Sequence, residues 1–118
     1  MGGTGDKGPQ AGRLLAELSA GPGAEGVETI LHRPDVRVER IVSHGHASPP
    51  GFWYDQAWDE WVMLVTGSAA VLIDGEATAR ELCVGDWLLL PARCRHRVEW
   101  TDPRGPTVWL AVHFEAQA

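Results

Sequence analysis

The chain has 118 residues with a hydrophobic fraction of 44%, which is enough for one globular domain with its own core. Its formal net charge is −6 and Lys and Arg form no cluster, which argues against nucleic acid or an anionic membrane as the main partner. No stretch approaches the roughly 20 apolar residues of a membrane span. The 14 glycines and 8 prolines divide the chain into short segments, and this favours strands over long helices.

The N-terminal part of the chain changes character after its first residues. Residues 1–10 contain little that can be buried, so we expect a disordered arm there. Residues 11–118 form the predicted single domain. At its start, three leucines recur at helical spacing ahead of a Gly-Pro-Gly stop, which predicts one short helix over residues 12–20.

The rest of the domain consists of nine short runs rich in β-branched and aromatic residues, and each run predicts a strand. Asp74-Gly75 predicts a tight hairpin turn between the fifth and sixth strands. Short strands with turn signals between them predict an all-β fold, either a sandwich or a closed antiparallel β-barrel. The predicted strands cover residues 27–31, 36–42, 52–56, 60–66, 69–73, 77–82, 87–91, 95–100 and 107–114.

A carboxylate stands at the start of the fourth of these runs. On a strand, Glu60 shares one face with Val62 and Leu64, and the residues between them face the other way. An ionised carboxylate buried among aliphatic side chains needs a counter-charge, a metal or several hydrogen bonds. We therefore expect Glu60 either to lie at the rim beside an arginine such as Arg95, or to take part in chemistry.

Residues on both sides of this run resemble the two sequence motifs of the cupin superfamily. The first cupin motif has a glycine, a His-x-His pair, a glutamate and a second glycine. The second motif has a glycine, a proline after five residues, another glycine, a histidine and an asparagine. The residues that match in type and spacing are Glu60, Gly67, Gly85, Pro91 and His96. The resemblance covers roughly residues 38–114 and implies a small jelly-roll barrel of two antiparallel sheets.

Several motif positions hold other residues. Tyr54 and Gln56 replace the two histidines of the His-x-His pair, and Ser48 replaces the glycine before them. In the second motif, Arg93 replaces the inner glycine and Trp100 replaces the asparagine. Two of the metal-binding histidines that are usual in cupins are therefore missing.

The resemblance implies a mononuclear metal site made of Gln56, Glu60 and His96. The carbonyl of Gln56 would act as a neutral oxygen ligand. One nitrogen and two oxygens suit a divalent transition metal, with Mn, Fe and Ni favoured over a closed structural Zn site. The alternative for His96 is a barrel histidine whose ring is hydrogen-bonded to a backbone carbonyl.

Three other histidines are candidates for the same site. His44 and His46 form a His-x-His pair, but they lie sixteen and fourteen residues before Glu60 in a register that the cupin motif does not use, and a solvated loop explains them as well. His113 alternates with Trp109 in the last predicted strand, so it either lines the pocket or faces outward.

The six tryptophans either line a ligand cavity or pack in the core and at a dimer interface. Two functions follow. The first is a metal-dependent enzyme, oxidoreductase- or dioxygenase-like, that acts on a small molecule. The second is a non-catalytic cupin that binds or senses a small ligand without metal.

In both cases we expect a homodimer, because a small barrel leaves strand edges open. We also expect a cytoplasmic location, because Cys83 and Cys94 at this spacing suit free thiols.

Overall fold

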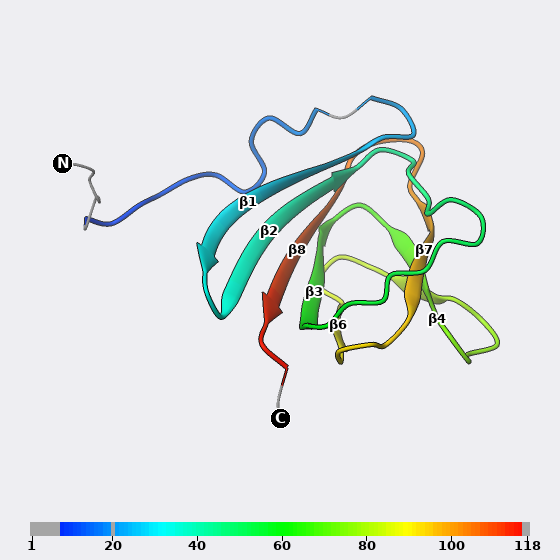
Figure 1. The fold of residues 1–118 in the computed structure, drawn as a ribbon. Coiled ribbons are helices and arrows are strands. Elements are labelled where there is room, and N and C mark those ends of the chain that lie inside the picture. The colour runs from blue at the N-terminus through cyan, green and yellow to red at the C-terminus, as the bar shows by residue number, and fades with distance from the viewer. Residues whose placement is uncertain (1–7, 20, 117–118) are drawn as a thin grey trace.

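The computed structural model describes residues 8–19 and 21–116. These residues form eight β-strands (Figure 1). Within the same residues there is no helix with the length and apolar character needed to cross a membrane. The strands are β1 (Glu25–Arg33), β2 (Val36–Ser43), β3 (Asp59–Thr66), β4 (Ala69–Ile73), β5 (Arg80–Leu82), β6 (Trp87–Leu90), β7 (His96–Thr101) and β8 (Thr107–Phe114).

The strands make two antiparallel sheets that face each other. One sheet has five strands in the order β1-β2-β8-β3-β6, and the other has three in the order β5-β4-β7. The inner faces of both sheets bury a common apolar core, whose buried members are Val62, Leu64, Ala69, Val71, Leu82, Leu88, Leu90, Trp109 and Ala111. The all-β antiparallel barrel predicted from the sequence is confirmed.

Alternating burial along β3 and β8 sets the position of the site. In β3, Glu60, Val62 and Leu64 are buried while the residues between them are partly exposed. In β8, Trp109 pairs with Leu64 and Ala111 pairs with Val62, so both point to the same inner face. The predicted assignment of Glu60 to the face of its aliphatic neighbours is therefore correct.

The short helix predicted over residues 12–20 is wrong for the residues that the structure describes, which exclude residue 20. The segment makes a turn without helix, and Glu17 adopts a left-handed φ of 54°. The guanidinium of Arg40 on β2 donates to the carbonyls of Leu14 and Ala16, which a helix would use internally. A helix this short gains few internal hydrogen bonds, so contacts with the sheet override its leucine pattern.

The predicted arm lies mostly beyond the described part of the chain. Residues 1–7 are outside the described residues, and residues 8–10 are exposed and have no regular structure. The division into an arm over residues 1–10 and one domain over residues 11–118 therefore stays a prediction.

Two predicted strands are shorter than expected. Residues 52–56 form only an isolated bridge between Tyr54 and His96, and the N–H of Phe52 closes a turn by donating to the carbonyl of Pro49. The tight turn at Asp74-Gly75 forms as predicted, because the N–H of Glu76 donates to the carbonyl of Ile73 at 3.0 Å. The sixth predicted strand begins at Arg80 instead of residue 77, so the loop between the two strands is longer than a two-residue hairpin.

The loop that precedes β3 closes the barrel along β7. Ser48 bonds to Val98 through its backbone and through its hydroxyl group, and the hydroxyl of Thr101 donates to the carbonyl of His46. The Tyr54–His96 bridge continues this pairing toward β3. These bonds hold the segment with the substituted cupin residues against the mouth of the barrel.

Candidate functional site

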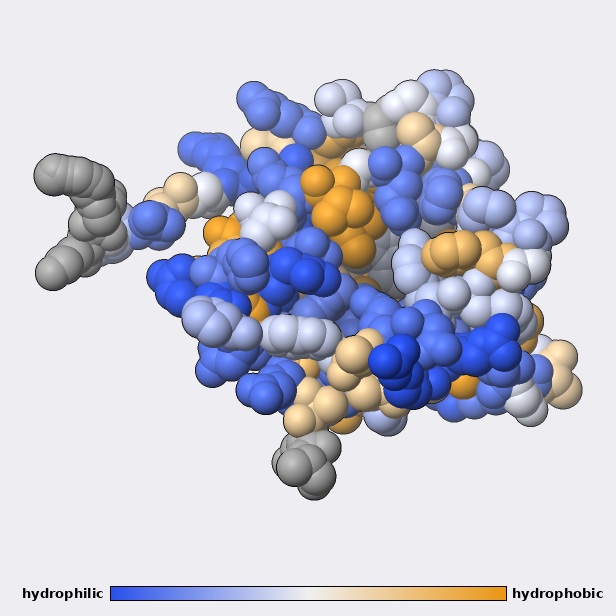
Figure 2. Space-filling model, viewed as in Figure 1, coloured by the Kyte–Doolittle hydropathy of each residue, from blue (hydrophilic) through white to orange (hydrophobic). Residues whose placement is uncertain are grey.

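A cavity of about 240 Å³ opens between the two sheets. In the space-filling view, apolar side chains are exposed at the centre of this face and hydrophilic side chains surround them (Figure 2). The apolar wall includes Val62, Val71, Leu90, Val98 and Trp109. Polar residues lie on either side of this wall, so the cavity combines an apolar surface with a few placed polar groups, as ligand sites do.

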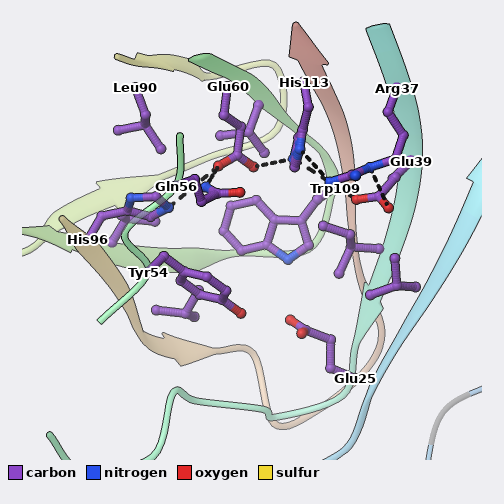
Figure 3. Close-up of a pocket in the computed structure, with 15 residues that line it drawn as sticks. Glu25, Arg37, Glu39, Tyr54, Gln56, Glu60, Leu90, His96, Trp109 and His113 are labelled. Carbon is purple, nitrogen blue, oxygen red and sulfur yellow. Dashed lines mark hydrogen bonds and ion pairs between the residues drawn. The ribbon is translucent and has the colours of Figure 1, made fainter. Parts of the chain in front are cut away.

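The deep polar part of the cavity is the Glu60 centre, which we define as Glu60 with Gln56, His96 and His113 (Figure 3). The amide Nε2 of Gln56 donates to Oε1 of Glu60 at 3.0 Å. Nε2 of His96 lies 3.5 Å from the same oxygen, and Nε2 of His113 lies 3.4 Å from Oε2. Three nitrogen atoms from separate segments therefore surround one carboxylate that is 8% exposed.

The ring of His96 is held by the backbone. Its Nδ1 lies 2.9 Å from the carbonyl oxygen of Cys94, and a carbonyl only accepts, so Nδ1 carries a proton. The ring also stacks on Tyr54, with 5.3 Å between the ring centroids. These contacts aim Nε2 at Glu60.

The ring of His113 is held by Arg37 on β2. Nη2 of Arg37 lies 3.1 Å from Nδ1 of His113, and a guanidinium only donates, so Nδ1 is the acceptor. In the neutral ring the proton must then sit on Nε2, which faces Glu60 and lies 3.9 Å from Glu39. Glu39 in turn pairs with Nε of Arg37 at 3.1 Å.

The surroundings shift three pKa values in this centre. Burial alone raises the pKa of Glu60, but hydrogen bonds from His96 and Gln56 and the nearby imidazoles outweigh it and hold the pKa below 4.5. Burial lowers the pKa of His96, but its bonds to Glu60 and to the Cys94 carbonyl raise the pKa overall. Burial lowers the pKa of His113, and with the positive charge of Arg37 it outweighs the opposing negative charges of Glu60 and Glu39. These shifts favour the charged forms of Glu60 and His96 and the neutral form of His113, whose buried Nε2 has no hydrogen-bond partner among the described residues.

The side chain of Tyr54 stands at the other wall of the cavity. Burial and the negative charges of Glu25 and Glu60 raise the pKa of its hydroxyl group to about 12. The hydroxyl therefore stays protonated at neutral pH and is available to donate.

The structure brings together the three residues expected to form one site. Gln56, Glu60 and His96 lie side by side in the cavity wall. Arg95 does not pair with Glu60, because its guanidinium binds Asp74. The rim position considered for Glu60 is therefore excluded.

Of the three other candidate histidines, His113 lines the cavity and the other two do not. His113 faces the cavity, which settles the alternative that its strand pattern left open. His46 lies apart from the Glu60 centre, with its Nδ1 3.3 Å from the carbonyl of Gly23. Neither His44 nor His46 is among the residues that line the cavity.

Sequence reasoning missed the charged residues that β1 and β2 place in the cavity. Arg37, Glu39 and Ile41 alternate on one face of β2, and Glu25 begins β1. A signal was present, because charged residues at every second position of a β-branched run indicate that one face of the strand has a polar role. The pairing of Arg37 with His113 depends on the sheet order and has no local sequence signal.

One substituted motif position shows why glycine is usual there. Arg93 adopts a left-handed φ of 66°, which glycine accepts at no steric cost. Its backbone N–H donates to the carbonyl of Gln56, and its guanidinium pairs with Asp55. The bend is therefore kept despite the change of residue.

The donor groups of the Glu60 centre fit a metal ion poorly. Across the described residues, no three side chains of the types His, Cys, Asp and Glu are grouped so that they would hold a metal. Gln56 faces Glu60 with its NH₂ group, and neutral His113 faces it with an N–H, and neither group is a metal ligand. The metal role of Gln56, Glu60 and His96 stays a prediction.

Comparisons with solved structures give close matches. A protein from Ralstonia eutropha JMP134, provisionally named a mannose-6-phosphate isomerase, is 52% identical with a TM-score of 0.88, over 92% of this chain and 100% of that chain. A cupin superfamily protein from Desulfitobacterium hafniense is 18% identical with a TM-score of 0.71, over 91% and 94%. KdgF from a Halomonas species is 21% identical with a TM-score of 0.63, over 82% and 85%. No family model and no curated protein matches the sequence.

Two facing antiparallel sheets with a cavity between them define a small jelly-roll barrel. The Glu60 centre occupies the positions at which the two sequence motifs meet inside that barrel. The chain has the cupin fold.

Proposed function

We propose that this cupin binds a small organic molecule in its cavity and does so without a resident metal ion. The observation that carries the proposal is the arrangement around Glu60, whose carboxylate is surrounded by nitrogen atoms of Gln56, His96 and His113. A buried carboxylate needs either a cation or such donors. Because Gln56 and His96 supply these contacts from the chain itself, the charge of Glu60 is compensated without a metal.

The cavity suits a ligand that is small and partly apolar. Its volume of about 240 Å³ is below the range of roughly 300–1,000 Å³ that is typical of sites for drug-sized molecules. The indole of Trp109 and the ring of Tyr54 offer flat contact surfaces, and the aliphatic wall lies beside them. A ligand with a compact hydrocarbon or ring body would bury most of its surface there.

The ligand named for the Ralstonia protein is a poor match to this cavity. Mannose 6-phosphate would bring a phosphate group to a wall that holds the carboxylates of Glu25, Glu39 and Glu60. The one guanidinium in the wall, that of Arg37, is already paired with Glu39. Like charges in a partly buried site repel, so we carry over from that relative a small-molecule ligand and not the sugar phosphate.

Metal titration tests the proposal directly. We expect calorimetric titration with Mn(II), Fe(II), Ni(II) and Zn(II) to show no stoichiometric binding at the cavity, because the donor atoms of Gln56 and His113 are N–H groups turned toward Glu60. Elemental analysis of protein purified without added metal should agree.

Metal binding at the cavity would be recognised from its loss in two variants and its retention in a third. Stoichiometric binding that is lost in His96→Ala and in Glu60→Gln, and kept in the double variant His44→Ala, His46→Ala, would overturn the metal-free proposal. It would support the metal-dependent enzyme that the sequence motifs suggest, with the ligands Gln56, Glu60 and His96.

We also propose that the chain forms a homodimer through the outer face of the five-stranded sheet. On that face Met63 pairs with Trp87, and Trp61 pairs with Leu89, across β3 and the edge strand β6. Trp87 is 57% exposed and Leu89 is 54% exposed. Large apolar side chains gathered beside an open strand edge are typical of a surface that pairs with a second copy.

Sedimentation at micromolar concentration tests the dimer. We expect the wild type to sediment as a dimer and the double variant Trp87→Glu, Leu89→Glu to sediment as a monomer, because two charges would be buried without partners at the interface. Trp100→Glu is the matched control, since Trp100 is exposed on the other sheet and should leave the dimer intact. A wild type that is monomeric would contradict this proposal.

A further inference from the structure

We propose that the ligand of this cavity carries a positively charged amino group, and that this group binds beside Glu25. The inference rests on the proposed binding function and adds the chemical class of the ligand. Glu25 lines the cavity at the side away from the Glu60 centre, where Figure 3 shows its carboxylate facing the hydroxyl of Tyr54 below the Trp109 ring.

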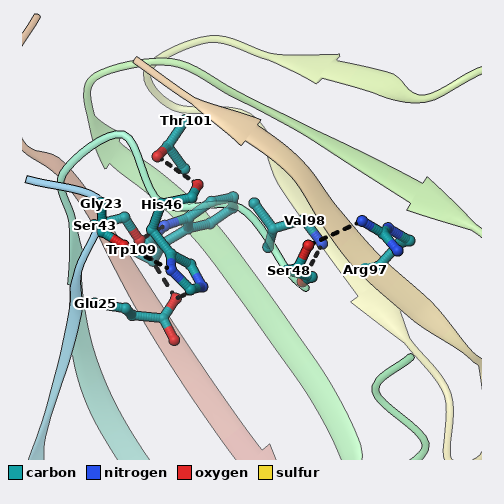
Figure 4. Close-up of polar contacts among 9 residues, drawn as sticks. All are labelled: Gly23, Glu25, Ser43, His46, Ser48, Arg97, Val98, Thr101 and Trp109. Atoms are coloured by element: carbon teal, nitrogen blue, oxygen red, sulfur yellow. Dashed lines mark hydrogen bonds and ion pairs between the residues drawn. The ribbon is translucent and has the colours of Figure 1, made fainter. Parts of the chain in front are cut away.

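A network of polar contacts holds the carboxylate of Glu25 in place (Figure 4). The indole Nε1 of Trp109 donates to Oγ of Ser43 at 3.3 Å, and Oγ of Ser43 donates to Oε2 of Glu25 at 3.4 Å. Ser43 is fully buried and Trp109 is 4% exposed. The cavity wall therefore positions this carboxylate through buried groups, in contrast to a surface glutamate that moves freely.

The charge of Glu25 is poorly compensated by the chain. Within the described residues, the only basic group at ion-pair distance is His46, whose Nε2 lies 3.9 Å from Oε2. The side chain of Glu25 is 20% exposed, so water screens it only in part. A cationic group on a ligand would supply the missing counter-charge.

The charges of the other residues in the cavity wall also favour a cationic ligand. The carboxylates of Glu25, Glu39 and Glu60 face it, against the guanidinium of Arg37 and the ring of His96. Arg37 is paired with Glu39, and His96 is paired with Glu60, so neither compensates the charge of Glu25. The side with Glu25 therefore keeps a negative potential, which attracts cations and repels anions.

Aromatic and aliphatic groups beside Glu25 complete the site. The rings of Trp109 and Tyr54 line the cavity, and an ammonium group over an aromatic face is stabilised by the ring quadrupole. Val27 and Ile41 line the cavity as well and can contact a hydrocarbon body. These features together describe a small primary amine with a compact apolar body.

Three probes of the same shape separate the charge from the body. Cyclohexylammonium, cyclohexanol and cyclohexanecarboxylate are titrated into the wild type, and the indole N–H signal of Trp109 is followed by NMR after its assignment with Trp109→Phe. We expect cyclohexylammonium to bind about tenfold more tightly than cyclohexanecarboxylate, with cyclohexanol between them.

Two variants locate the charge effect. Glu25→Gln should reduce the affinity for cyclohexylammonium about tenfold and leave that for cyclohexanol unchanged, since only the ammonium uses the charge. Glu81→Gln is the control, because Glu81 is exposed on β5 and does not line the cavity. Equal affinities for the ammonium and the carboxylate, or no effect of Glu25→Gln, would overturn the amine assignment alone. A wild type that binds none of the three probes would overturn the binding function itself.

Discussion

Replacing Gly67 with alanine should lower the free energy of unfolding by about 3 kcal/mol, because the new Cβ is strained and also clashes. Gly67 has a φ of 91° in the short link that carries the chain from β3 in one sheet to β4 in the other. A Cβ there would lie 2.7 Å from Cα of Thr107, which is backbone and cannot turn away. Chemical denaturation followed by circular dichroism measures the loss.

Gly75→Ala separates the two causes. Gly75 has almost the same φ, 93°, but a Cβ there meets nothing within 4 Å. We therefore expect a loss of about 1 kcal/mol from backbone strain alone. Similar losses of stability in both variants would show that Thr107 moves aside, and that the close contact between Gly67 and the start of β8 does not contribute to stability.

Replacing Glu60 with glutamine should lower the free energy of unfolding by about 2 kcal/mol near pH 5.5, because it removes one partner of a buried ion pair. The change keeps the size of the side chain and its contact with Gln56. It deletes the charge that faces His96 and His113 at 3.5 Å and 3.4 Å. The measurement is chemical denaturation of both proteins over a range of pH.

The effect of this substitution should depend on pH in two directions. The folded-state pKa of Glu60 is below its ordinary value of 4.5, so its contribution is complete above pH 4.5 and is lost as the pH falls through the folded pKa. The folded-state pKa of His96 is above its ordinary value of 6.5, so its contribution is complete below pH 6.5 and is lost as the pH rises through the folded pKa. The difference between wild type and Glu60→Gln should therefore be largest between pH 4.5 and 6.5.

Glu76→Gln provides the control for charge removal at the surface. Glu76 pairs with Arg80 at 2.7 Å, but both side chains are largely open to water, so little change in stability is expected at any pH. If Glu60→Gln also leaves the free energy of unfolding unchanged, with no largest difference from wild type between pH 4.5 and 6.5, the carboxylate is not part of a buried ion pair in solution.

Local patterns in the sequence predicted the framework of the site. The alternation of Glu60, Val62 and Leu64 has a period of two, and this period sets which face of β3 is buried. The resemblance to the cupin motifs implied that the side chains of Glu60 and His96 would meet, and they lie 3.5 Å apart at the nearest atoms. Such predictions succeed because strand geometry and turns are short-range properties.

Other predictions failed or stayed open because long-range contacts decide them. The leucine pattern before β1 indicated a helix, but Arg40 takes the carbonyls of Leu14 and Ala16. The direction of His113 was undecided because a strand pattern assigns residues to two faces without saying which one is inner. Pairing of β8 between β2 and β3 settles it.

The sequence by itself determined an all-β chain and the face on which Glu60 lies, since both depend on spacing along the chain. The grouping of Gln56, Glu60 and His96 was implied by the resemblance to the cupin motifs, and the structure places the three side chains next to one another. Only the tertiary structure decided what surrounds that site. The order of strands in the larger sheet sets Arg37 against His113, and the start of β1 sets Glu25 across the cavity from the Glu60 centre. These residues are far apart in sequence, so their charges, tautomers and shared cavity follow from the pairing of strands and not from any local motif.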